Sequence, residues 1–576
     1  MISVSSLKPL MAYSYVESLM KRVETLKAAS RLSVEPLSVA DQVFVHDEAE
    51  SLESLQSAPS LSLSFDKHFL FLSGGRESFQ FYGSSSVFTL TVQLMHHAFK
   101  KELVSIDTTS EGARHVDVSG TDEYYHLVLD RFPQVDHVKC LLQLYLVSSN
   151  TMYGIVDEAA AWTDLEAYLD LRTREDMHYT ALRGEKAHQY FRVSMMCAIA
   201  CATRARYQPT CTGESMAYYS DALTCLEDVT SEVSAASLQA LMLLVVFCLF
   251  FPGKGDIWKL LDYACRLSVE LGYHTEQAAD QETDMQRRLR RSTFWGLYAI
   301  ERIVGQLFGR GSDLPEPIIT TEYPNAVTVT SPLDHDQASF QPISIAHHYR
   351  LVYLRSEIYK ELYLPGTQPK FDNKWYTERH ATLQAWRNDL PTLDDLTGVS
   401  TITCDVGYHS TICFLFQPLI LEAISQTCKD ATNTPKTFAS IPQDNYWSAC
   451  ELIRTYAKVM RAPESSALGT YPITFMSAHY MYLAGLTVLA HCLIALDGRV
   501  GTWKSLDEAN MITSPSCEAV IEEGNIDFTD LYEVSGTCLI LLTWCAERWS
   551  GMVGMLDIYK SLSDKLIPAM IRRGLV

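Results

Sequence analysis

The stretch from Val233 to Gly253 carries no charged residue, and it limits the possible folds more than any other feature of the sequence. It is long enough to cross a bilayer, which takes a helix of about 20 apolar residues. However, it contains Gln239, it stops at Pro252-Gly253, and we find no second convincing span in the chain. A helix that is apolar on every side can also form the centre of a large helical protein. We therefore predict a buried core helix and no membrane association.

Composition agrees with a folded protein that avoids nucleic acid. The chain has 47% apolar and 20% charged residues, as globular proteins do. Its net charge is −22, with 69 acidic residues against 47 Lys and Arg. Affinity for phosphates comes from Lys and Arg, so any contact with DNA needs a separate basic module or a partner.

The 15 cysteines are scattered and form no Cys-x-x-Cys, which indicates a reducing compartment. No charged segment followed by an apolar one opens the chain, so we expect no secretory signal.

Helix signals follow the uncharged stretch in close order. Asp256 can cap a helix that starts at Ile257, and Gly272 can take the left-handed position after its end. Thr283 and Gln286 have the spacing of a capping box for the next helix, which Gly309 ends. The predicted buried stripe of that helix consists of Phe294, Leu297, Ile300, Val304 and Leu307.

Helical periodicity continues through most of the remaining chain. A serine cluster after Gly83 can cap a helix that begins near Val87. Further amphipathic helices are expected around Leu351, Leu383, Phe414, Ile453, Leu483 and Leu541. We predict an all-α fold, a large multi-helix domain with antiparallel helix packing and no substantial sheet.

Three segments in fixed order carry a resemblance to a known family. An uncharged helix comes first, then a helix that starts near Trp258 and ends in Leu271-Gly272-Tyr-His274, and then an Arg-rich helix that ends in Gly309-Arg310-Gly. This order resembles the regulatory ("fungal-specific transcription factor") domain of the fungal binuclear zinc-cluster activators. The sequence departs from the family pattern at Glu301, where the family has aspartate, and at Gly311, where it has proline. The residues that match the family motif are Trp258, Leu271, Gly272, His274, Arg287, Arg288, Phe294, Trp295, Arg302, Gly309 and Arg310.

The resemblance implies a helical domain that modulates transcription in a fungal nucleus and has no catalytic residue. In the family, a cysteine-rich zinc cluster reads DNA, and it precedes a linker and a coiled coil. The segment around Tyr15 resembles that linker and coil. We therefore expect DNA contact through an upstream zinc cluster or a partner protein, and we expect zinc only with such a cluster. The expected domains are a linker over 1–66, with a short helix at 13–29 and an acidic Ser/Leu-rich segment, the regulatory domain over 67–330, and a helical remainder of the same body over 331–576.

Two segments are candidates for contact with partners. One is an apolar seam formed by Val16, Leu19, Val23 and Leu26. This seam either supports a homodimer or heterodimer or belongs to an ordinary amphipathic helix. The other alternates acids with bulky apolar residues, and it either docks into transcription machinery or a coactivator or forms a loop between helices. Its apolar members are Ile526, Phe528, Leu531 and Tyr532.

Motifs of enzymes are missing or incomplete. The sequence has no HExxH, no GxxxxGK and no GxGxxG after a strand. Asp394-Asp395 starts like a metal-binding DDxxD helix, but Gly398 takes the place of the third acid. Cys197 and Cys201 supply only two of the four ligands that zinc needs, so we interpret them as core residues.

The Arg-rich helix contains a local basic patch of Arg287, Arg288, Arg290 and Arg291. This patch either serves nuclear import or a phosphate contact, or it has a structural role. We predict the structural role, in which these arginines line one helix face above Trp295 and Tyr298. The resemblance implies that the chain regulates transcription of a specific gene set, and association alone points to a biosynthetic gene cluster. The alternative is an all-helical enzyme or small-molecule binding protein.

Overall fold

The computed structural model describes most of the chain after residue 68. The described residues are 69–71, 79–81, 84–99, 134–173, 182–276, 283–324, 343–364, 373–390, 398–426, 441–496 and 528–573. All of them belong to the unit from Ser60 to Val576. The predicted seam residues Val16 to Leu26, the candidate Ile526 and the Asp394-Asp395 pair lie outside the described residues.

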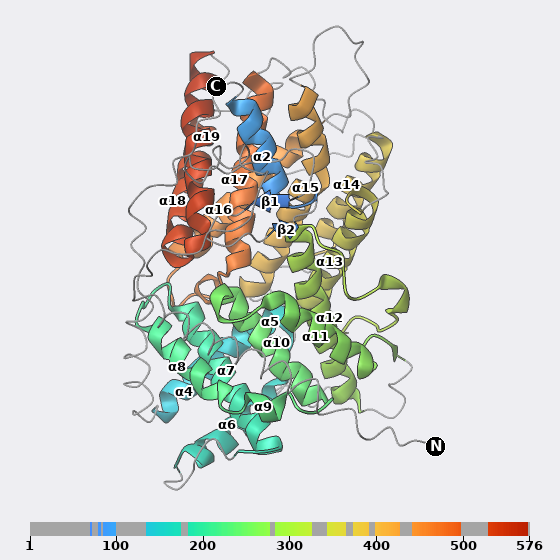
Figure 1. Cartoon of the computed structure of the whole chain (residues 1–576), viewed down its shortest axis with the longest axis vertical. Coiled ribbons are helices and arrows are strands. Elements are labelled where there is room, and N and C mark those ends of the chain that lie inside the picture. The colour runs from blue at the N-terminus through green and yellow to red at the C-terminus, as the bar shows by residue number, and fades with distance from the viewer. Residues whose placement is uncertain are drawn as a thin grey trace, which may run out of the picture. The chain divides into compact units, whose positions relative to one another are not determined.

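The described elements of the first half are helical except for one short hairpin (Figure 1). In the hairpin, β1 (Phe69–Phe71) pairs antiparallel with β2 (Phe79–Phe81), and Phe69 lies opposite Phe81. The helices that follow are α2 (Val87–Ala98), α4 (Val135–Val147), α5 (Ser149–Tyr153), α6 (Glu158–Thr173), α7 (Glu185–Arg204), α8 (Cys211–Leu223), α9 (Leu226–Val229), α10 (Ala235–Phe250), the 3-10 turn η4 (Pro252–Lys254), α11 (Ile257–Glu270) and α12 (Asp284–Phe308).

A connector over 309–324 holds the short 3-10 turn η6 (Glu316–Ile318), and the second half is again helical. Its elements are α13 (Ile343–Leu362), α14 (Asn373–Asn388), α15 (Gly398–Gln426), α16 (Gln443–Arg461), η8 (Leu468–Thr470), α17 (Phe475–Leu496), α18 (Phe528–Arg548), η11 (Ser550–Met552) and α19 (Val553–Arg572). The all-α prediction is confirmed, since the described residues form no sheet beyond the hairpin.

Helix starts follow the cap residues that the sequence indicates. Ser86 accepts a hydrogen bond from the Phe88 amide, and Asp256 accepts from the amides of Trp258 and Lys259. Thr283 and Gln286 form the predicted capping box. Gly272 and Gly309 follow their helices with φ of 74° and 71°, the left-handed backbone that favours glycine.

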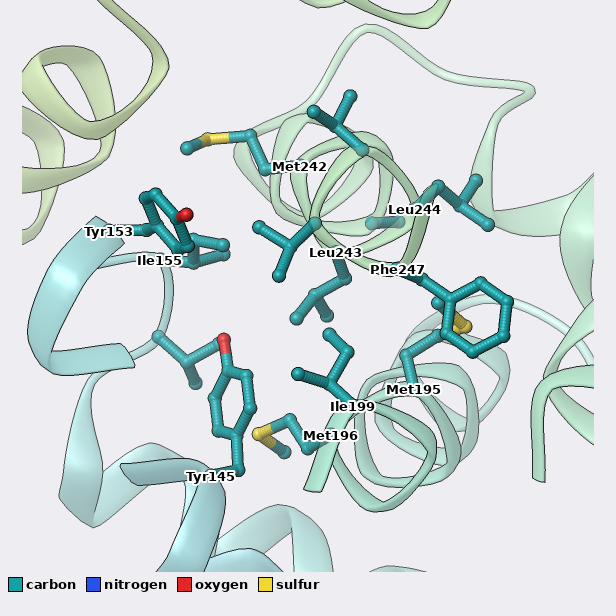
Figure 2. Close-up of a cluster of buried hydrophobic side chains, with 14 of the residues drawn as sticks. Tyr145, Tyr153, Ile155, Met195, Met196, Ile199, Met242, Leu243, Leu244 and Phe247 are labelled. Carbon is teal, nitrogen blue, oxygen red and sulfur yellow. The ribbon is translucent and has the colours of Figure 1, made fainter. Parts of the chain in front are cut away.

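The first core lies among α4 to α8, α10 and α12. Figure 2 shows how side chains of α4, α5, α7 and α10 meet there, among them Tyr145, Ile199 and Leu243. The predicted core helix α10 is buried from Leu238 to Phe250 apart from Gln239, whose amide donates to the Ile155 carbonyl at 3.0 Å. The sequence therefore assigned this helix correctly as a core element.

The second core lies among α2 and α15 to α19, and α16 to α19 run side by side in Figure 1. Helix α17 (Phe475–Leu496) is buried from Ser477 to its end. Among the described residues it is the one helix long and apolar enough to cross a membrane, and its apolar window is fully covered by protein. The expectation of an amphipathic helix around Leu483 with no second uncharged span was wrong, because Phe475–Leu496 carries no Asp, Glu, Lys or Arg.

A smaller third cluster joins α13, α14 and α15 around Tyr363, Trp386 and Phe414. Helix α12 links the two larger cores, since Ile303 and Phe308 contact both of them. The predicted stripe of α12 is buried, with at most 4% of any member exposed. Helix α12 thus joins the two larger cores, and the motif residues lie within it or next to it.

Four buried histidines make stability depend on pH. Burial lowers the pKa of His348 and His479 to about 4, and of His409 and His491 to about 3. An unfolded histidine takes up a proton below pH 6.5, whereas these remain neutral in the fold. Their contribution is therefore complete above pH 6.5 and is lost as the pH falls from about 6.5 toward about 4.

We expect the urea midpoint of unfolding to be lower at pH 5.5 than at pH 7.5. The upper limit is about 1.4 kcal/mol per pH unit for each histidine. Because His491 faces the Asn445 side chain at 2.8 Å, His491→Gln keeps a polar partner there and should flatten the profile. Equal midpoints at the two pH values would show that these residues already take up protons in the fold.

Candidate functional site

The motif residues of α11 and α12 meet at the loop that follows α12. The guanidinium of Arg310 lies 4.1 Å from the ring centre of Trp258. The Trp258 ring also contacts the ring of Phe308 edge-on, with 5.4 Å between the centres. Because Gly309 reverses the backbone, the Arg310 amide can donate to the Gly305 carbonyl at 2.8 Å. Arg310 therefore closes the end of α12 against the start of α11.

Arg302 fixes the next part of the connector from inside the fold. It is 4% exposed, and its guanidinium donates to Glu301 at 2.6 Å, to Glu316 at 3.0 Å and to the Leu314 carbonyl at 2.5 Å. Burial alone would lower the pKa of Arg302, but Glu301, Tyr298 and Glu316 outweigh burial and raise it. The residue stays charged, and its single positive charge is shared between the carboxylates of Glu301 and Glu316.

Glu276 holds the far end of the connector. Its carboxylate accepts from Arg291 at 2.8 Å, from the Thr321 hydroxyl at 3.1 Å and from the Glu322 amide at 3.0 Å. These hydrogen bonds outweigh the effect of burial and lower the pKa of Glu276 to about 2. Arg290 completes the set by donating to the Thr275 carbonyl at 2.7 Å. The carboxylate remains ionised across the physiological range.

The remaining motif residues also contact this connector or the core. The carbonyl of His274 accepts from the amides of Thr320 and Thr321, at 2.8 and 3.2 Å. Trp295 is buried, and its indole N–H donates to the Glu322 carbonyl at 2.9 Å. Phe294 lies in the first core, and Leu271 packs against it.

The four arginines of the basic patch do not share one environment. Arg290 and Arg291 hold the connector through Glu276, whereas Arg287 pairs with the exposed Asp284 at 3.0 Å and Arg288 is exposed. The sequence analysis missed the acidic partners Glu276, Glu316 and Glu322. The sequence did contain a signal for these ion pairs, because acidic residues occur in the polar segments on both sides of the Arg-rich helix.

Two small clefts flank the Gly309-Arg310-Gly311 loop, with volumes of about 290 and 320 Å³. Both are lined by Glu301, Gly305, Arg310 and Gly311. Their buried acids and cations bond one another, as Glu301 and Glu316 do with Arg302. This pairing stabilises the loop.

The described cysteines do not fit a zinc site. Cys197 and Cys201 are fully buried in α7, as predicted, and burial raises the pKa of both thiols. Among the described residues, no group of three His, Cys, Asp or Glu could hold a metal ion. The described part of this chain therefore holds no set of ligands for zinc.

The candidate segment for partner contact near the C-terminal end has one buried and one exposed side chain. Helix α18 starts at Phe528, Leu531 is buried in the second core, and Tyr532 is 67% exposed. Whether this segment activates transcription stays a prediction.

The helices and the connector that the arginines hold in place form one helical domain. Comparison with known families agrees, since residues 142–388 match the fungal specific transcription factor domain. Residues 142–388 of the chain therefore carry a fungal transcriptional regulator domain. The matched range contains every motif residue of α11, α12 and the connector.

Curated relatives have names that describe regulators. The chain is 27% identical over 199 residues to pyrimidine pathway regulatory protein 1 of Saccharomyces cerevisiae, which covers 31% of this chain and 22% of that protein. It is 25% identical over 191 residues to a negative regulator of pleiotropic drug resistance of Candida glabrata, covering 32% of this chain and 19% of that protein. It is 22% identical over 320 residues to the positive regulator of purine utilization of Emericella nidulans, covering 44% and 30%. The matches thus span less than a third of the length of each of these relatives.

Proposed function

We propose that this protein regulates the transcription of a specific set of fungal genes in the nucleus. The observation that carries the proposal is the match over residues 142–388, whose motif residues hold α11, α12 and the connector together. The names of the relatives refer to a pyrimidine pathway, to drug resistance and to purine utilization. A set of genes with one metabolic task, such as a biosynthetic gene cluster, is the corresponding target here.

Contact with DNA requires a basic module, because the chain has an excess of 22 negative charges. We propose that a zinc cluster or a partner regulator supplies that contact, and that the helical domain then engages transcription machinery or a coactivator. Pairing with a second copy or another regulator would place two such modules on one site. Tyr532 is the exposed aromatic residue of the candidate activation segment.

A tethering experiment tests this function. The full chain is fused to a foreign DNA-binding domain and placed upstream of a silent reporter and of a constitutive one. We expect a several-fold rise of the first or a several-fold fall of the second, and Tyr532→Ala should weaken an activating fusion. Val553→Ala is the control, since Val553 is exposed on α19 outside the candidate segment. A fusion that is abundant in the nucleus and changes neither reporter would contradict the proposal.

A further inference from the structure

Two arginines from distant parts of the chain meet where the end of α7 faces η8 and α18. Arg206 follows the last turn of α7, and Arg548 is the last residue of α18. Arg548 donates through Nη2 to the Ala202 carbonyl at 3.0 Å. Arg206 donates through Nη2 to the carbonyls of Leu468 and Gly469. Each guanidinium is thus anchored on one side by backbone oxygens.

Some of the nitrogen donors of these two guanidinium groups have no hydrogen-bond acceptor among the described residues. Nε and Nη1 of Arg206 and Nε of Arg548 are shielded from solvent and have no hydrogen bond within the described residues. Native proteins leave few buried donors without a partner, and each such donor calls for an explanation. Three such donors belong to these two neighbouring arginines, and a ligand that accepts hydrogen bonds would satisfy them.

Charge supports the same conclusion. The nearby carboxylate of Glu464 accepts from Arg204 at 2.7 Å and from Gln208 at 3.0 Å, so it is already engaged. Burial lowers the pKa of Arg206, and burial together with the charge of Arg206 lowers the pKa of Arg548 to about 10. The two cations therefore repel each other, and Glu464, which offsets part of the charge of Arg206, is shared with Arg204 and Gln208.

Aromatic rings hold the two guanidinium groups by their faces. Arg206 lies over Tyr207 at 4.6 Å from the ring centre, and Arg548 lies near Trp544 and Trp549 at 5.5 and 5.7 Å. Stacking of this kind leaves the N–H donors in the guanidinium plane available. That planar fork matches the paired oxygens of a carboxylate or a phosphate.

We propose that Arg206 and Arg548 form a binding site for a small oxyanion, the phosphate or carboxylate group of a soluble ligand. The anion would accept from the three unpaired donors and neutralise the repulsion between the two cations. Arg206 follows α7 of the first core, and Arg548 ends α18 of the second. Binding would therefore tie the two cores together and stabilise one arrangement of them.

Thermal unfolding of the full chain tests the site. We would compare phosphate, sulfate and citrate with sodium chloride at equal ionic strength. We expect at least one oxyanion to raise the Tm by about 2 °C or more and to do so saturably, because a ligand that binds only the folded state stabilises it. A response to phosphate and sulfate alone assigns a phosphate-type ligand, and a response to citrate alone assigns a carboxylate.

Variants separate the site from general charge effects. Arg548→Gln and Arg206→Gln should each abolish the response, whereas Arg183→Gln, at the other end of α7 and 84% exposed, should retain it. If Arg548→Gln does not fold, Arg206→Gln and the titration of the unmodified chain decide. Equal Tm values in chloride and in all three oxyanions would overturn the proposal. Loss of the response in Arg183→Gln would do so as well.

Discussion

Replacing Gly296 by alanine is expected to destabilise the protein by about 3 kcal/mol. Gly296 lies in α12 where this helix crosses the end of α5. A Cβ atom at this position would overlap the carbonyl oxygen of Tyr153 and would lie 3.5 Å from the Met242 methyl group. A flexible side chain could turn away from such an overlap, but a backbone carbonyl cannot. The helix would have to move, and it joins the two larger cores.

Gly536→Ala is the matched control for this substitution. Gly536 also lies inside a helix, α18, but it is exposed and no atom lies within 4 Å of its would-be Cβ. Alanine should therefore stabilise α18 by about 0.5–1 kcal/mol, because glycine is the poorer helix former. Urea unfolding followed by circular dichroism measures both variants. Similar midpoints for the two would show that α12 and α5 are not in close contact.

Replacing Arg302 by methionine should cost about 3–5 kcal/mol of stability, the effect of breaking a buried ion pair from one side. Methionine fills part of the volume, but it leaves Glu301 and Glu316 without their cation. Both carboxylates lie in low-exposure surroundings, with side chains 5% and 11% exposed. The connector should loosen as well, since Arg302 also bonds the Leu314 carbonyl.

A double variant and a surface control complete this test, which is read from urea midpoints. Adding Glu316→Gln to Arg302→Met should recover part of the loss, because it removes one of the unpaired charges. Arg266→Met breaks an exposed pair with Asp262 and should change stability by about 0.5 kcal/mol or less. If Arg302→Met cost no more than Arg266→Met, the Arg302 network would contribute nothing to the fold.

Most of the helical framework could be predicted from the sequence, because its signals are local. Asp256, Thr283 and Gly309 act on backbone groups within a few residues of themselves, and each performs the predicted role. The burial of α10 followed from the lack of charge in its sequence. Helix α17 has a comparable composition, and it was missed because a single apolar seam was assumed there.

The contacts of the motif residues could not be predicted in the same way. Glu276 reaches Arg291 and Glu322, and Arg302 reaches Glu316, only after the connector has folded back on α12. Arg206 and Arg548 belong to opposite halves of the chain, and their local sequences give no sign that they meet. Such pairs depend on how helices cross, which spacing within one helix does not determine.

The most direct test of the central proposal is the transcript profile after rapid depletion of this protein from the nucleus. We expect a limited set of transcripts to change within the first measurements, and we expect the unmodified chain to reverse the change when it is restored. We also expect the Gly296→Ala chain to restore the profile poorly and the Gly536→Ala chain to restore it fully. An unchanged transcript profile after complete depletion, under several growth conditions, would contradict a role in transcription.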